Sequence, residues 1–121
     1  MKSVLIAEPD LVVRAMLADV TGEFFPDVAL HLPTCSNEVL ALAEVLAPPA
    51  IAVLHEGLLR DYTGHCVHKL KLAKVPVILT MNSSMRPPSR LVSQADAILE
   101  RPFGASDYLE ILERSLRWAK G

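Results

Sequence analysis

Five short apolar runs are spaced along the chain and separated by longer segments of mixed polarity. They are VLIA (4–7), VALHL (28–32), AIAVL (50–54), PVILTM (76–81) and DAIL (96–99). Most of these runs are continuous rather than alternating, which is typical of strands in a parallel sheet that is covered on both faces. The pattern therefore predicts five parallel strands.

The segments between these runs carry the spacing of amphipathic helices. The first helix is predicted to begin near Asp10 and to end before Pro26, which cannot continue it. The second is predicted to follow Ser36 as its N-cap, because apolar residues then repeat at helical intervals, at Val39, Leu42, Ala43 and Leu46.

Two further helices are predicted in the second half of the chain. The adjacent prolines of segment 82–94 make its helix short, and we expect it to begin at or after Pro87. The last helix is predicted from the capping-box spacing of Asp107 and Glu110. Its apolar stripe consists of Tyr108, Ile111, Leu112 and Leu116.

This alternation of strands and helices predicts one α/β domain that occupies residues 1–121. Right-handed crossovers place helices on both faces of a five-stranded parallel sheet, which is a doubly wound architecture. In such sheets, sites form at the carboxyl ends of the strands, next to a switch in strand order. The residues to examine are therefore those at 8–10, 55–57, 80–82 and 100–103.

Composition and charge exclude several classes of function. The chain has 12 basic and 14 acidic residues, a formal net charge of −2, which gives no electrostatic footprint for nucleic acid or an anionic membrane. Acidic residues appear after only four apolar ones at the N-terminus, so we expect no signal peptide. Cys35 and Cys66 are expected to be reduced thiols, and the protein is expected to be cytoplasmic.

Four of the strand-end segments together resemble the receiver domain of bacterial response regulators, the CheY-like family. They are VLIAEPDLVVRAML (4–17), PAIAVL (49–54), VPVILT (75–80) and QADAILERPF (94–103). The resemblance spans nearly the whole chain and implies a (βα)5 flavodoxin-like fold. It also implies a phosphorylation switch in which an acidic pair holds Mg²⁺ and an aspartate accepts the phosphoryl group. A hydroxyl and a lysine then contact the phosphoryl oxygens.

The sequence departs from the family's pattern at most of these positions. The acidic pair corresponds to Glu8 and Pro9, and Asp10, which follows, resembles a helix cap. The phosphoacceptor corresponds to His55 if counted along the strand, or to Glu56 if counted back from Gly64. The hydroxyl position falls on Thr80 or Met81. The lysine corresponds to Arg101, before Pro102, and the aromatic switch position corresponds to Ile98.

These departures predict a degenerate receiver, or pseudo-receiver, that is not an enzyme. The expected function is a phosphorylation-independent protein-interaction module in two-component-type signalling, with no cofactor, because the Mg²⁺ ligands are incomplete. We expect Arg101 to pair with Glu8 or Glu56 and to hold the pocket in one state. Alternatives are an atypical but functional Mg²⁺-dependent phosphorelay receiver and a small-ligand or metal-binding domain on the same scaffold.

Two groups of residues carry side chains that could bind a metal. Glu8, Asp10, His55 and Glu56 could supply nitrogen and oxygen ligands for a transition metal. The GHCVH segment, 64–68, has helical ligand spacing but lacks a second ligand pair. We predict no metal at either place.

The expected partners are a sensor kinase or an output protein, and a homodimer is possible. In the family, the surface of the fourth helix, fifth strand and fifth helix usually mediates partner binding. The residues that the resemblance places on that surface are Arg90, Leu91, Ile98, Tyr108, Arg117 and Trp118.

Overall fold

The computed structural model describes residues 2–56, 63–82, 94–101 and 103–120; for residues 63, 64 and 116–120 it describes the backbone only. Five strands and four helices lie within these ranges. In chain order they are β1 (Ser3–Ala7), α1 (Leu11–Phe24), β2 (Ala29–His31), α2 (Ser36–Val45), β3 (Ala50–His55), α4 (Thr63–Leu72), β4 (Val77–Asn82), β5 (Ala97–Arg101) and α6 (Ala105–Lys120).

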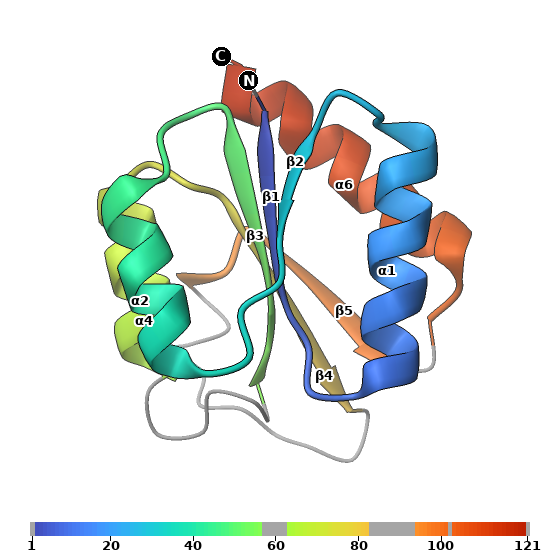
Figure 1. The fold of residues 1–121 in the computed structure, drawn as a ribbon, viewed down its shortest axis with the longest axis horizontal. Helices are drawn as coiled ribbons and strands as arrows, with labels where there is room; N and C mark the ends of the chain where they lie inside the picture. The colour runs from blue at the N-terminus through green and yellow to red at the C-terminus, as the bar shows by residue number, and fades with distance from the viewer. Residues whose placement is uncertain (1, 57–62, 83–93, 102, 121) are drawn as a thin grey trace.

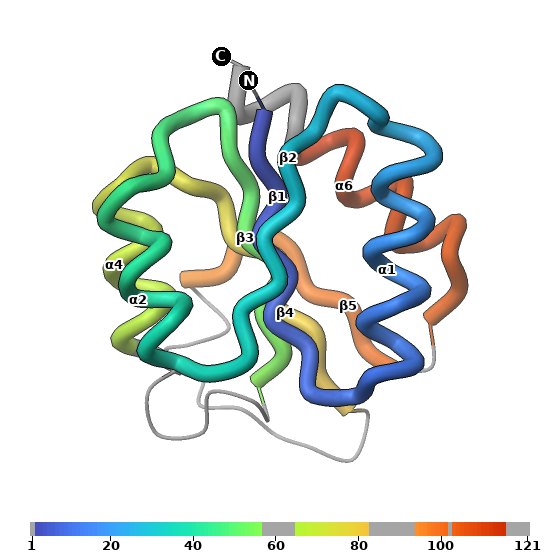
Figure 2. The backbone as a smooth tube through the Cα atoms, in the orientation of Figure 1, coloured from blue at the N-terminus to red at the C-terminus, as the bar shows by residue number. Residues whose placement is uncertain are grey.

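The five strands form one parallel sheet in the order β2-β1-β3-β4-β5. Helices α1 and α6 cover one face, and α2 and α4 cover the other (Figure 1). The predicted doubly wound, flavodoxin-like architecture is therefore confirmed. Figure 2 shows that the strands run in one direction, so that their carboxyl ends gather toward the lower edge of the view. Strand order changes direction at β1, and the residues that follow β1 and β3 flank this switch point.

Each face of the sheet contributes alternate strand residues to its own apolar cluster. Leu5, Leu54 and Leu79 pack beneath α2 and α4. Ile6, Val53 and Ile78 pack beneath α1 and α6. The strands are buried on both faces, which explains why their sequences are continuously apolar. None of the described helices is long and apolar enough to cross a bilayer.

Two of the predicted helix starts differ from those observed. The cap on α1 is confirmed, since the Asp10 carboxylate accepts hydrogen bonds from the backbone N–H groups of Val12 and Val13, at 2.9 and 3.2 Å. Ser36 is not an N-cap but the first residue of α2. The start of α2 is instead braced by Glu38, whose carboxylate accepts from the backbone N–H and the hydroxyl of Thr34.

The predicted capping box of α6 is wrong by one turn. Asp107 lies inside the first turn, and its Oδ2 accepts a hydrogen bond from the Gly104 backbone N–H at 3.1 Å. It therefore closes the helix start from within, as the third-position acid of a capping box does. The helix predicted to begin at or after Pro87 falls on residues 83–93, which lie outside the described residues.

Candidate functional site

Four strand ends bring polar side chains together at the carboxyl edge of the sheet. On each of these strands, alternate residues pack beneath α1 and α6: Ile6 on β1, Val53 on β3, Ile78 on β4 and Leu99 on β5. Side chains two positions apart on a strand share a face. The next residues on that face are Glu8, His55, Thr80 and Arg101. Each was predicted from the sequence as a pocket residue, and the fold brings all four to one edge.

The centre of this cluster is an ion pair between Glu8 and Arg101. Arg101 Nη2 donates to Glu8 Oε1, and the Glu8 side chain is only 1% exposed, against 23% for Arg101. The other carboxylate oxygen, Oε2, accepts from the backbone N–H of Asp10 at 3.0 Å. Of the two partners predicted for Arg101, the structure contains Glu8. A buried carboxylate with both oxygens engaged is held in one orientation.

His55 ends β3 and lies beside this ion pair. It is 4% exposed and is paired in register with Thr80 on β4. Burial lowers the pKa of His55 below its usual value of 6.5, and the positive charge of Arg101 adds to this effect. Glu8, a hydrogen bond with the Asn82 side chain and Glu56 act in the opposite direction but do not cancel it. The imidazole is therefore neutral at pH 7.

Asn82 was given no role from the sequence, although it closes one of the strand ends that were singled out. It is the last residue of β4, and it pairs in register with Arg101 on β5. The signal that could have found it is its spacing from Thr80, because two residues further along a strand return to the same face. Asn82 thus joins the side chains of His55 and Arg101 at the edge of the sheet.

The sequence left two choices open, between His55 and Glu56 and between Thr80 and Met81, and the structure distinguishes the members of each pair. His55 and Thr80 lie on the face of the sheet that carries Glu8. Met81 comes two residues after Leu79 on β4, so its side chain lies on the face covered by α2 and α4. Thr80 is buried, and its Oγ1 lies 3.5 Å from the Leu54 carbonyl oxygen to which it donates. Glu56 follows β3 and is half-buried. His55 and Thr80 therefore occupy the site, with Glu56 as a charged neighbour.

The acidic residues at this edge do not fit Mg²⁺. The Glu8 carboxylate already accepts hydrogen bonds from the Arg101 side chain and from the Asp10 backbone N–H. The Asp10 carboxylate caps α1, and the side chain of Pro9 has no atom that could bind a metal. Mg²⁺ requires several oxygen ligands in near-octahedral geometry, and a guanidinium beside the main carboxylate opposes a second cation. Among the described residues there is no group of three or more histidine, cysteine or acidic side chains that could hold a metal.

The GHCVH segment lies at the start of α4, which covers the face of the sheet opposite to the one that carries this cluster. His65 and His68 are exposed, whereas Cys66 is fully buried and its Sγ lies 3.9 Å from the Ser36 carbonyl oxygen. Burial raises the pKa of the Cys66 thiol to about 11, so that it stays protonated at neutral pH. Both cysteines are free. The three candidate ligands therefore do not converge on one point.

The residues predicted for the partner surface have mixed outcomes. Tyr108 is wrong as a surface residue, because its side chain is fully buried on the sheet-facing side of α6 and its hydroxyl is hydrogen-bonded to Thr21. Ile98 is half-buried and packs against the apolar cluster beneath α2 and α4. The remaining positions, and one pocket residue, lie outside what the structure describes: Arg90, Leu91 and Pro102 entirely, and the side chains of Arg117 and Trp118.

The position of His55 has a consequence for stability in acid. Because its pKa is lowered in the folded state, the unfolded chain binds more protons below pH 6.5, and stability falls as the pH drops from 6.5 toward the folded-state pKa. A single group contributes a slope of at most about 1.4 kcal/mol per pH unit. We expect His55→Gln to flatten this part of the profile, measured by urea unfolding between pH 7 and 5. Equal slopes in both proteins would contradict the assignment.

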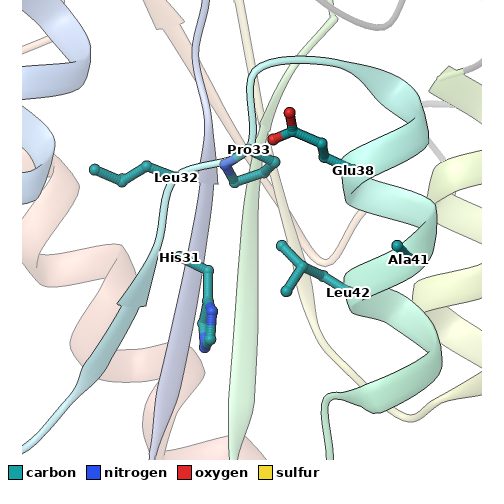
Figure 3. Close-up of a pocket in the computed structure, with 6 residues that line it drawn as sticks. All are labelled: His31, Leu32, Pro33, Glu38, Ala41 and Leu42. Carbon is teal, nitrogen blue, oxygen red and sulfur yellow. The ribbon is translucent and has the colours of Figure 1, made fainter.

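Two surface grooves lie away from the strand-end cluster. One, of about 350 Å³, lies between β2 and α2 and is lined by His31, Leu32, Pro33, Glu38, Ala41 and Leu42 (Figure 3). The other, of about 340 Å³, lies between β5 and α6. Neither of these two grooves is lined by Glu8, His55 or Arg101.

Comparison with known proteins identifies the fold. No family model and no curated protein matches the sequence. The chain is similar to the signal receiver domain of the DNA-binding response regulator merR from Colwellia psychrerythraea 34H, with a TM-score of 0.80, 18% identity and coverage of 97% of this chain and 99% of that one. FixJ-N gives a TM-score of 0.75 at 21% identity, covering 97% of this chain and 94% of that one.

A longer protein contains the same fold as one part. NtrX from Brucella abortus, in complex with ADP, matches with a TM-score of 0.79 and 18% identity over 98% of this chain. The chain spans only about a quarter, 26%, of that protein. At these identities the comparisons show that the chain has the fold of response regulator receiver domains.

Proposed function

We propose that this chain is a degenerate receiver that works as a phosphorylation-independent protein-interaction module in bacterial two-component-type signalling. We place it in the cytoplasm, without a cofactor or catalytic activity of its own, with a sensor kinase or an output protein as its partner. The observation that carries this proposal is the buried ion pair of Glu8 with Arg101 beside a neutral His55. The receiver fold supports the setting.

The pocket lacks the chemistry that a receiver switch needs. A carboxylate nucleophile must stand at the end of β3, and that position holds the imidazole of His55. Glu56 is one residue further along, and its carboxylate is one methylene longer than that of aspartate. Near-attack geometry tolerates little displacement of the nucleophile.

The ion pair supplies internally the charges that a switch would receive from outside. In the working site that the resemblance implies, Mg²⁺ and a phosphoryl group bring charge into the pocket, and a lysine balances the negative charge of the phosphoryl oxygens. Here the guanidinium of Arg101 is already engaged by Glu8. We infer that the pocket stays in one conformation, and that a partner therefore always binds the same surface.

A phosphoryl mimic tests whether the pocket can still respond. We expect that Mg²⁺ with beryllofluoride leaves the amide resonances of Glu8, His55, Thr80 and Arg101 unchanged in ¹⁵N-resolved NMR spectra, because His55 rather than an aspartate stands at the end of β3 to hold the beryllium. Mg²⁺ alone serves as the control for unspecific binding of the cation. Saturable shifts at these residues that need both components would contradict the proposal.

A further inference from the structure

Helices α2 and α4 pack side by side over one face of the sheet, and they carry opposite charges (Figure 1). The charged residues of α2 are the acids Glu38 and Glu44, and this helix has no basic residue. Those of α4 are Lys69 and Lys71, in a helix with two histidines and no acidic residue. The outer surface of this pair of helices is therefore divided into an acidic half and a basic half.

Two large apolar side chains are exposed at the ends of these helices. Val45, the last residue of α2, is 75% exposed, and Leu72, the last residue of α4, is 68% exposed. Just before these ends, the ion pair of Glu44 with Lys69, at 3.3 Å, joins the two helices. Both helices connect parallel strands and run in the same direction. At a rise of about 1.5 Å per residue, Val45 and Leu72 then differ in height along the helices by only about 3 Å.

A second copy of the chain fits this division of charge in one orientation. Two identical faces that meet around a two-fold axis form an interface in which each surface contacts its own copy. An axis parallel to the helices places α2 of each copy opposite α4 of the other, so that acidic residues meet basic ones. An axis across the helices would instead place α2 opposite α2 and α4 opposite α4, with like charges facing each other.

The favourable orientation also brings the exposed apolar residues together. Because Glu44 and Lys69 lie level, Glu44 of one copy comes opposite Lys69 of the other, and two ion pairs join into a ring of four charges. Val45 then faces Leu72 of the second copy, which removes both side chains from water. Lys71 stays outside this contact, because it binds Asp96 at 2.8 Å on the side of α4 toward β5.

We propose that the surface of α2 and α4 binds a second copy of this chain in a two-fold dimer, with Glu44 opposite Lys69 and Val45 opposite Leu72. This surface differs from the one that the resemblance gives for partner binding, which includes β5 and the last helix. The dimer goes beyond the proposed function, because it needs no phosphoryl group. A monomeric chain would leave the proposal for the pocket unchanged.

Sedimentation velocity over a range of concentrations up to the millimolar tests this dimer. We expect a concentration-dependent dimer that weakens in high salt, because salt screens the charges at the interface. Glu44→Lys alone and Lys69→Glu alone should each weaken dimerisation roughly tenfold, because like charges then face each other across the axis. An equal mixture of the two variants should form a heterodimer of about wild-type affinity, since each lysine again meets a carboxylate.

Matched substitutions elsewhere on the chain serve as controls. Glu110→Lys also reverses the charge of one member of an exposed ion pair, but on α6, across the sheet, and it should leave the affinity within about twofold. Leu72→Ser should weaken the dimer roughly tenfold, because both halves of the interface lose an apolar side chain. Leu11→Ser makes the same change on α1, at a residue that is 66% exposed, and should have no effect.

Three results would overturn the proposal. The first is a chain that stays monomeric at every concentration. The second is a dimer that Glu44→Lys, Lys69→Glu and Leu72→Ser all leave unchanged, because the second copy would then be bound through another surface. The third is a mixture of the two charge variants that fails to associate, since the proposed orientation requires that these charges meet between the copies.

Discussion

Replacing Arg101 or Glu8 by alanine is expected to lower the free energy of unfolding by about 3 kcal/mol in each case. Removing one partner of a buried ion pair leaves the other charge uncompensated, which typically costs roughly 3–5 kcal/mol. We expect a loss at the lower end of this range because the pair is only partly buried. The Arg101 side chain is 23% exposed, whereas that of Glu8 is 1% exposed. The pair itself need not add net stability, since desolvation of both charges offsets their attraction.

A double-mutant cycle measures the interaction between the two side chains. Glu8→Ala, Arg101→Ala and the double variant should give a coupling energy of about 1–3 kcal/mol in denaturant unfolding. The exposed pair Glu110–Arg114 provides the matched control, with side-chain exposures of 71% and 56%. Its coupling should stay near 0.5 kcal/mol or below. Additive effects at Glu8 and Arg101 would mean that the two charges do not hold the pocket together.

Replacing Tyr108 by alanine is expected to lower stability by about 3–5 kcal/mol, the usual cost of truncating a fully buried aromatic side chain. Tyr108 is completely buried on α6, and its hydroxyl lies 2.6 Å from the Thr21 hydroxyl on α1. Tyr108→Phe keeps the ring and removes only this hydrogen bond, at a cost of about 1 kcal/mol at pH 7. If both variants lost the same amount, the ring would not be packed in the core.

The same residue gives the protein a distinctive response to alkali. Burial raises the pKa of Tyr108 to about 12, with the hydrogen bond to Thr21 only partly opposing it. The unfolded chain therefore loses this proton first, and the stability that Tyr108 contributes is intact below pH 10 and is lost between pH 10 and 12. The loss is roughly 2–3 kcal/mol over this range. Tyr108→Phe should show a shallower decline, and identical profiles would argue against a buried phenol.

The strands and their common site edge could be predicted because parallel sheets leave a strong mark on sequence. A strand covered on both faces must be apolar throughout, so the runs at 50–54 and 76–81 stand out without any knowledge of tertiary structure. The carboxyl ends of parallel strands necessarily share one edge. Glu8, His55, Thr80 and Arg101 were therefore identifiable together as pocket residues.

The choice between neighbours could not be made from sequence. His55 and Glu56 differ by one position, and a shift of one residue along a strand exchanges its two faces. The register of β3 with β4, which pairs His55 with Thr80, resolves this choice. The partner of Arg101 likewise depends on contacts between β1 and β5, which are separated in the sheet by two other strands.

Tyr108 shows how two lines of inference from one sequence can disagree. Its helical spacing with Ile111 and Leu112 indicated a buried stripe, whereas the resemblance placed it on a partner surface. Burial decided in favour of the stripe, because α6 must cover the sheet with its apolar side chains. The local physical pattern was the better guide here than the analogy.

We infer that this pocket does not take up a phosphoryl group. The most direct measurement is the intact mass of the folded protein after incubation with Mg²⁺ and acetyl phosphate, beside a folded triple variant, Pro9→Asp with His55→Asp and Arg101→Lys, in which the missing groups are restored. We predict no gain for the wild-type chain. A gain of one phosphoryl group, mapped to His55, Glu56 or Asp10, would contradict the account and make the pocket a working switch.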